Sequence, residues 1–141
     1  MRLLLISSSV VHGTGYLDHA EAELRDFLGA TRRLLFVPFA QADHEAYTTR
    51  VRERLAAMDI AVEGLHAAAE PQAAIAGAGA VFVGGGNTFC LLAELQRRAL
   101  LAALHARVLA GAAYVGSSAG TNLAGLTIGT TNDMPIVWPT S

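Results

Sequence analysis

The sequence has little cysteine, little charge and no long apolar run, and each shortage excludes a class of protein. Cys90 is the single cysteine among 141 residues, so no disulfide can form within the chain. Charged residues make up 16% of the sequence and the formal net charge is -2, which offers no basic surface to nucleic acid or to an anionic membrane. No apolar stretch reaches the length that spans a bilayer. We therefore expect a cytoplasmic protein with neither nucleic-acid nor membrane partners.

Hydrophobic residues make up 52% of the chain, and short apolar runs alternate with longer helical patterns. Strands are expected at residues 3–6, 34–37, 60–65, 80–83 and 112–115. Helices are expected at residues 17–28, 44–58, 71–76, 89–98 and 101–110. This alternation predicts a single α/β domain over residues 1–141, with a mostly parallel sheet between two layers of helices. Thr88 is expected to cap the helix at 89–98, and Cys90 is expected to be a small core residue.

The unusual segments of the chain follow the expected strands. Residues 7–9 are three serines after the first strand, residues 39–41 follow the second, and residues 84–87 read Gly-Gly-Gly-Asn after the fourth. Ser118 follows the fifth strand. Because the carboxyl ends of parallel strands share one edge of the sheet, these segments are expected to meet in one ligand site.

Ser118 lies in the sequence Gly116-Ser117-Ser118-Ala119-Gly120, between an expected strand and a helix. Glycines at these positions permit a tight turn that pushes the central serine outward. The amides that follow lie at a helix N-terminus, where negative charge is stabilised. Ser118 is therefore a candidate nucleophile. The alternative is a Gly/Ser-rich turn with no chemistry.

The triple glycine has a specific use if Ser118 attacks a carbonyl group. Backbone without Cβ atoms can approach a ligand closely and direct its amides at an oxyanion. Ala119 is one candidate donor, and Gly85 or Gly86 is the second. The alternatives are a phosphate cradle or a plain tight turn. The segment lacks the Lys-Ser/Thr of a P-loop and is not G-x-G-x-x-G, so the nucleotide alternative is weaker.

A serine nucleophile needs a base, which is most often histidine. The chain has five histidines, all before Ser118 in the sequence: His12, His19, His44, His66 and His105. His12 follows the first expected strand and could approach the site, whereas the other four fall on helical faces or in a loop. No histidine spacing indicates a metal site.

Through these segments the sequence resembles peptidase E, the aspartyl dipeptidase family of serine peptidases. The resemblance extends over the whole chain and is most specific at residues 83–89, 116–124 and 130–136. It implies a fold related to class I glutamine amidotransferases and hydrolysis of dipeptides with an N-terminal aspartate, without metal or cofactor. It also implies that Ser118 is the nucleophile and Asp133 the acidic member of the triad. By its local sequence alone, Asp133 is more simply part of a turn.

Members of the family continue beyond the point reached here, through an Asn-Pro-His-like segment that carries the catalytic histidine. The resemblance therefore implies that the chain is the N-terminal portion of a longer domain, truncated at the C-terminus and inactive alone. Self-association, or pairing with a separate C-terminal segment, is the corresponding expectation for partners. Two other functions stay open: a cyanophycinase-like peptidase on the same scaffold, and a non-catalytic binding or assembly module.

Overall fold

The computed structural model describes residues 2–6 and 17–127, which form a parallel sheet covered by helices. The strands are β1 (Arg2–Ile6), β2 (Arg33–Val37), β3 (Ala61–Gly64), β4 (Ala80–Val83) and β5 (Ala113–Ser117). The helices are α1 (Glu21–Leu28), α2 (His44–Ala56), α3 (Pro71–Ala76), α4 (Thr88–Arg97), α5 (Leu101–Leu109) and α6 (Ala119–Thr127), with 3-10 turns at Asp18–Ala20 and Leu65–Ala67. The sheet order is β1-β5-β4-β2-β3, and every pairing is parallel.

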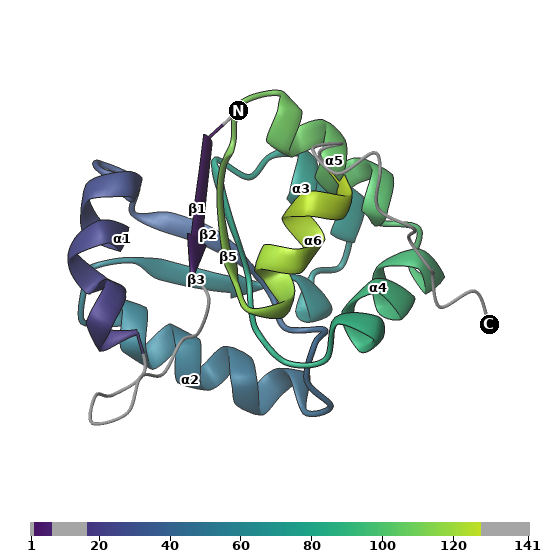
Figure 1. Ribbon diagram of the computed structural model, residues 1–141, viewed down its shortest axis with the longest axis horizontal. Helices are drawn as coiled ribbons and strands as arrows, with labels where there is room; N and C mark the ends of the chain where they lie inside the picture. The colour runs from purple at the N-terminus through teal and green to yellow at the C-terminus, as the bar shows by residue number, and fades with distance from the viewer. Residues whose placement is uncertain (1, 7–16, 128–141) are drawn as a thin grey trace.

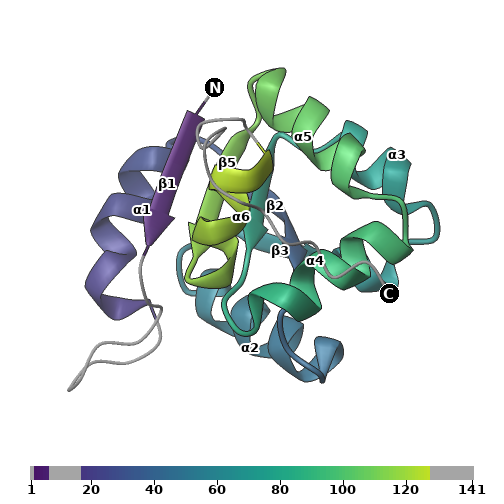
Figure 2. The same ribbon diagram turned by 45° about the vertical axis from the view of Figure 1, so that its right-hand side comes forward.

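Two hydrophobic cores lie on opposite faces of this sheet. Successive side chains of a strand point to opposite faces, so Leu34 and Phe36 of β2 join one core, and Leu35 and Val37 join the other. Helices α1 and α2 cover the first face, and α3, α4, α5 and α6 cover the second (Figures 1 and 2). The predicted three-layer α/β fold is confirmed, because strands with two buried faces need helices on both sides.

The structure corrects two details predicted for α4. Asn87, rather than Thr88, caps this helix: its side chain accepts a hydrogen bond of 3.0 Å from the amide of Cys90. Cys90 is exposed rather than buried in the core. The helix turns Leu91, Leu92 and Leu95 inward, and this leaves the first-turn cysteine outside.

Helix α6 packs directly on the backbone of β4. A Cβ atom added at Gly120 would lie 2.1 Å from the carbonyl oxygen of Val83, a backbone atom that cannot turn away. Gly116, at the end of β5, is equally confined, because a Cβ there would lie 2.7 Å from the carbonyl oxygen of Gly120. The glycines of the G-x-S-x-G sequence are thus required by the close contact of strand and helix.

Replacing Gly120 tests this contact. Gly120→Ala is expected to lower the free energy of unfolding by about 3 kcal/mol, because the new methyl group forces α6 away from β4. The matched control is Gly79→Ala, where an added Cβ meets nothing within 4 Å. Urea unfolding of both variants measures the difference, and an equally small effect at the two glycines would contradict the packing described here.

Candidate active site

Ser118 occupies a strained turn between β5 and α6. Its φ angle is 53°, in the left-handed region that residues other than glycine rarely adopt. The side chain of Ser118 is exposed, whereas Ser117 and Ala119 on either side are fully buried. The turn therefore presents the hydroxyl group of Ser118 outward and hides its neighbours, which is the geometry of a nucleophile elbow.

Hydrogen bonds from both sides hold this elbow. The amide of Ser118 donates to the carbonyl oxygen of Ile6 at the end of β1, at 2.8 Å. The hydroxyl of Thr121 lies 2.8 Å from that same oxygen and 3.0 Å from the carbonyl oxygen of Gly116. The carbonyl of Ser118 accepts the amide of Asn122 at 3.1 Å, which begins α6. The strain at Ser118 is thus maintained by contacts with the strand edge and the helix.

The glycine loop, residues 84–87, lies beside Ser118. A Cβ atom placed on Gly85 would be 3.1 Å from the Cβ of Ser118. Gly86 has a φ of 139°, and a Cβ there would lie 2.4 Å from the carbonyl oxygen of Ala40, in the loop that follows β2. The structure therefore brings together three of the segments that the sequence placed at the carboxyl ends of strands.

The amides around Ser118 differ in their hydrogen bonding. In the glycine loop, the amides of Gly84, Gly85 and Asn87 donate to Val37, Tyr47 and Ala40 respectively. Among residues 2–6 and 17–127, the amides of Gly86 and Ala119 have no hydrogen-bond acceptor. Two amides with no acceptor among the described residues, one on each of two adjoining backbone segments, are donors of the kind that an oxyanion site uses.

The loop after β2 is joined to the other side of the site by side chains. The amide of Gln41 donates to the carbonyl oxygen of Gly85 at 3.4 Å. The guanidinium of Arg98, at the end of α4, lies 4.7 Å from the centre of the Phe39 ring. Arg98 also forms an ion pair of 2.9 Å with Glu94. The contacts of Gln41 with Gly85 and of Arg98 with Phe39 were not predicted, because each joins residues far apart along the chain.

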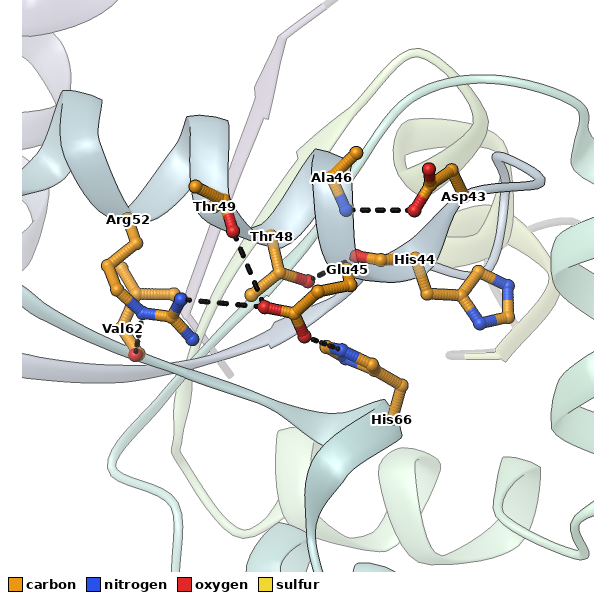
Figure 3. A network of polar contacts seen from close by, with 9 residues as sticks. All are labelled: Asp43, His44, Glu45, Ala46, Thr48, Thr49, Arg52, Val62 and His66. Atoms are coloured by element: carbon orange, nitrogen blue, oxygen red, sulfur yellow. Dashed lines mark hydrogen bonds and ion pairs between the residues drawn. The ribbon is translucent and has the colours of Figure 1, made fainter.

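Two of the histidines, His44 at the start of α2 and His66 in the 3-10 turn after β3, lie close together, with ring centroids 6.1 Å apart (Figure 3). The His44 ring packs edge-on against Phe39, and burial lowers the pKa of His44 below its usual range. Nε2 of His66 lies 2.8 Å from a carboxylate oxygen of Glu45, and Nδ1 of His66 is buried with no partner among the described residues. The ring of His44 is therefore half-buried rather than fully exposed to solvent.

The remaining predicted site residues fall on other parts of the chain than residues 2–6 and 17–127. Asp133, His12 and the serines at 7–9 lie outside the described residues. No group of three or more His, Cys, Asp or Glu side chains suited to a metal ion occurs in the part of the chain that the structure describes.

A cavity of about 860 Å³ is found along β3, lined by residues that include Arg33, Ala61 and Ala80 and none from the Ser118 turn or the glycine loop. None of the helices described is long and apolar enough to cross a bilayer.

An exposed serine on a strained turn between a parallel strand and a helix is the arrangement of the nucleophile elbow in α/β hydrolases. Comparison with known proteins identifies the family: the sequence model of peptidase family S51 matches residues 3–141, and the chain belongs to this family. The structure is also similar to that of a "Putative Peptidase E Protein" from Listeria monocytogenes. The TM-score is 0.66 and the sequence identity 21%, over 96% of this chain and 70% of the other, which supports the fold.

Curated relatives are similar over the whole chain. Peptidase E of Streptomyces coelicolor is 53% identical over 141 residues, which cover 100% of this chain and 58% of that protein. A Drosophila melanogaster protein named "Probable alpha-aspartyl dipeptidase" is 49% identical over 142 residues, covering 99% of this chain and 59% of that protein. The chain thus spans less than two thirds of the length of these relatives.

The strain at Ser118 has a measurable consequence for stability. Ser118→Gly is expected to raise the free energy of unfolding by about 1 kcal/mol, because glycine adopts the left-handed conformation without a Cβ clash. Ser118→Ala keeps the Cβ atom and is expected to match the parent. Urea unfolding compares the three proteins, and equal stability of the glycine and alanine variants would show that the turn is not strained.

The ion pairs of Glu94 predict a specific response to acid. Hydrogen bonds from Arg97, and then from Arg98, lower the pKa of Glu94 from 4.5 to about 2. Burial of the carboxylate opposes this shift but does not cancel it. The carboxylate therefore contributes stability above about pH 4.5, and this contribution is lost as the pH falls toward 2. Glu94→Gln is expected to cost about 1 kcal/mol at pH 7 and almost nothing at pH 2.

Urea unfolding at pH 7, 4 and 2 measures this response. Glu23→Gln, a substitution on the exposed surface of α1, is the matched control and should have little effect at any of these pH values. A Glu94→Gln difference that persists unchanged to pH 2 would contradict the role of the two arginines.

Proposed function

We propose that this chain carries the nucleophile and the oxyanion site of a serine-type dipeptidase that acts on dipeptides with an N-terminal aspartate. The observation that carries the proposal is the exposed Ser118 on a left-handed turn next to the glycine loop. Membership of peptidase family S51, and relatives named peptidase E and alpha-aspartyl dipeptidase, support the substrate class.

The proposed chemistry begins at the hydroxyl group of Ser118. Its oxygen attacks the carbonyl carbon of the scissile peptide bond as its proton passes to a base, and the carbonyl oxygen becomes an oxyanion. Collapse of this intermediate breaks the C–N bond, and the leaving amine takes the proton. Water, in place of the amine, then attacks the acyl-serine as the base takes its proton; collapse of this second intermediate breaks the bond to the serine oxygen, which regains the proton as the carboxylic acid product leaves.

The amides of Ala119 and Gly86 are the proposed donors to the oxyanion. Ala119 follows the nucleophile directly and begins α6, whose N-terminus favours negative charge. Gly86 is preferred over Gly85, because the amide of Gly85 already donates to the hydroxyl of Tyr47 at 2.8 Å. Of the two alternatives that the sequence left open, hydrogen bonding thus supports Gly86.

We assign the orienting carboxylate to Asp133, on the family resemblance. The described histidines at the site, His44 and His66, contact Phe39, Glu45 and each other, so neither is proposed as the base. Because the chain covers 58% of the Streptomyces coelicolor relative and 59% of the Drosophila melanogaster one, assays use the full-length protein, whatever its length, as well as the 141-residue chain. Self-association, or pairing with a separate C-terminal segment, is proposed for the short chain, because Leu5 on the outer strand β1 is 45% exposed.

Ser118→Ala in the full-length protein tests the proposed function. Hydrolysis of an aspartyl p-nitroanilide or dipeptide is expected to fall by a factor on the order of a million, because the alanine variant has no nucleophile. Asp133→Asn is expected to lower turnover by roughly 10⁴-fold through loss of the oriented base. Circular dichroism should show both variants folded.

The controls are leucyl p-nitroanilide and a β-aspartyl polymer, offered to the same preparations. Cleavage of the polymer in preference to aspartyl dipeptides would favour the cyanophycinase-like alternative. An alanine variant that keeps more than a few per cent of parental hydrolysis would show that Ser118 is not the nucleophile.

A further inference from the structure

Tyr47 belongs to α2, yet its hydroxyl group reaches the glycine loop that follows β4. The amide of Gly85 donates to the Tyr47 hydroxyl oxygen at 2.8 Å, and this buried hydrogen bond joins residues 38 positions apart. The Tyr47 side chain is only 3% exposed. A hydrogen bond of this kind gains strength from the low dielectric of its surroundings and is costly to leave unmade.

The ring of Tyr47 is fixed by its contacts. Phe36 of β2 packs edge-on against it with ring centroids 5.0 Å apart, and the guanidinium of Arg50 lies 5.0 Å from the ring centre. Gly84 lies against the tyrosine, since a Cβ atom there would be 2.5 Å from the hydroxyl oxygen and 2.8 Å from ring carbons. The glycine loop can therefore lie against Tyr47 only because residue 84 has no side chain.

This arrangement fixes the path of the loop beside Ser118. The amide of Gly84 donates to Val37 at 3.2 Å and the amide of Asn87 to Ala40 at 2.8 Å, so both ends of the loop are attached to the segment that includes the end of β2. The hydroxyl group of Tyr47 holds the middle of the loop to α2 through the amide of Gly85. Among the described residues, the amide of Gly86 is the single amide in residues 84–87 with no acceptor.

We propose that Tyr47 is a positioning residue for catalysis. Its hydroxyl group accepts the hydrogen bond of the Gly85 amide and so fixes the conformation of the glycine loop. In that conformation the amide of Gly86 is available to donate to the oxyanion. The inference rests on the proposed function, because an oxyanion forms only if Ser118 attacks a carbonyl. An oxyanion donor acts through its fixed placement before the reaction begins. A loosened loop therefore lowers turnover more than it weakens substrate binding.

The kinetic test uses Tyr47→Phe in the full-length protein, which removes the hydroxyl group and keeps the ring. With an aspartyl p-nitroanilide, kcat is expected to fall about tenfold or more, with KM changed by less than about twofold. Thr48→Val is the matched control: it removes a buried hydroxyl group from the same helix, one whose hydrogen bond of 2.7 Å goes to the carbonyl of His44 rather than to the glycine loop. An unchanged kcat in Tyr47→Phe, or an equal fall in Thr48→Val, overturns the proposal.

A second measurement separates this inference from the proposed function. Hydrogen exchange of the Gly85 amide, followed by NMR in the ¹⁵N-labelled protein, reports the Tyr47 hydrogen bond whether or not a dipeptide is hydrolysed. Exchange is expected to be at least about tenfold faster in Tyr47→Phe and unchanged in Thr48→Val. If the parent hydrolyses no aspartyl substrate but Gly85 exchange responds in this way, the proposed function fails and Tyr47 still positions the loop. If Gly85 exchange is the same in all three proteins, the role of Tyr47 is overturned.

Discussion

The close approach of backbone to backbone between β4 and the β5–α6 turn is the constraint on which the site depends. Gly120 lies against the carbonyl of Val83, and Gly85 lies against the Cβ of Ser118. A Cβ atom at Gly120 would lie 2.1 Å from that carbonyl oxygen and one at Gly85 would lie 3.1 Å from the Ser118 Cβ, so a side chain at either position would push the two segments apart. Two loops that are distant in the sequence therefore form one surface, which carries a hydroxyl group and two amides that have no acceptor within residues 2–6 and 17–127.

The strained turn persists because several contacts hold the residues on both sides of it in place. Ser118 is joined to the end of β1 through Ile6, and the two glycines that flank it at positions 116 and 120 pack without side chains. The packing around the turn thus offsets the conformational energy of a serine in the left-handed region. In the proposed mechanism this strained turn exposes the hydroxyl group of Ser118 and places the first amide of α6 beside it.

Local patterns were sufficient to predict the strands, the helices and the serine turn. Apolar runs located β2 and β4 within a residue of their ends, and Pro71 marked the start of α3. Details that depend on tertiary contacts could not be predicted in this way. Cys90 lies in an apolar run of five residues, 89–93, and only the packing of α4 decides which of them are buried. The bond between Tyr47 and Gly85 likewise has no sequence signal, so the choice between Gly85 and Gly86 as donor required the structure.

The most direct test of this account is a crystal structure of the full-length protein with Ser118 covalently modified by a phosphonate that mimics the tetrahedral intermediate. The account predicts that the phosphoryl oxygen lies about 2.7–3.1 Å from the amide nitrogens of Ala119 and Gly86. It also predicts that the amide of Gly85 remains bonded to Tyr47. An oxygen that points away from the glycine loop, or that accepts from Gly85 in place of Gly86, would contradict the oxyanion site described here.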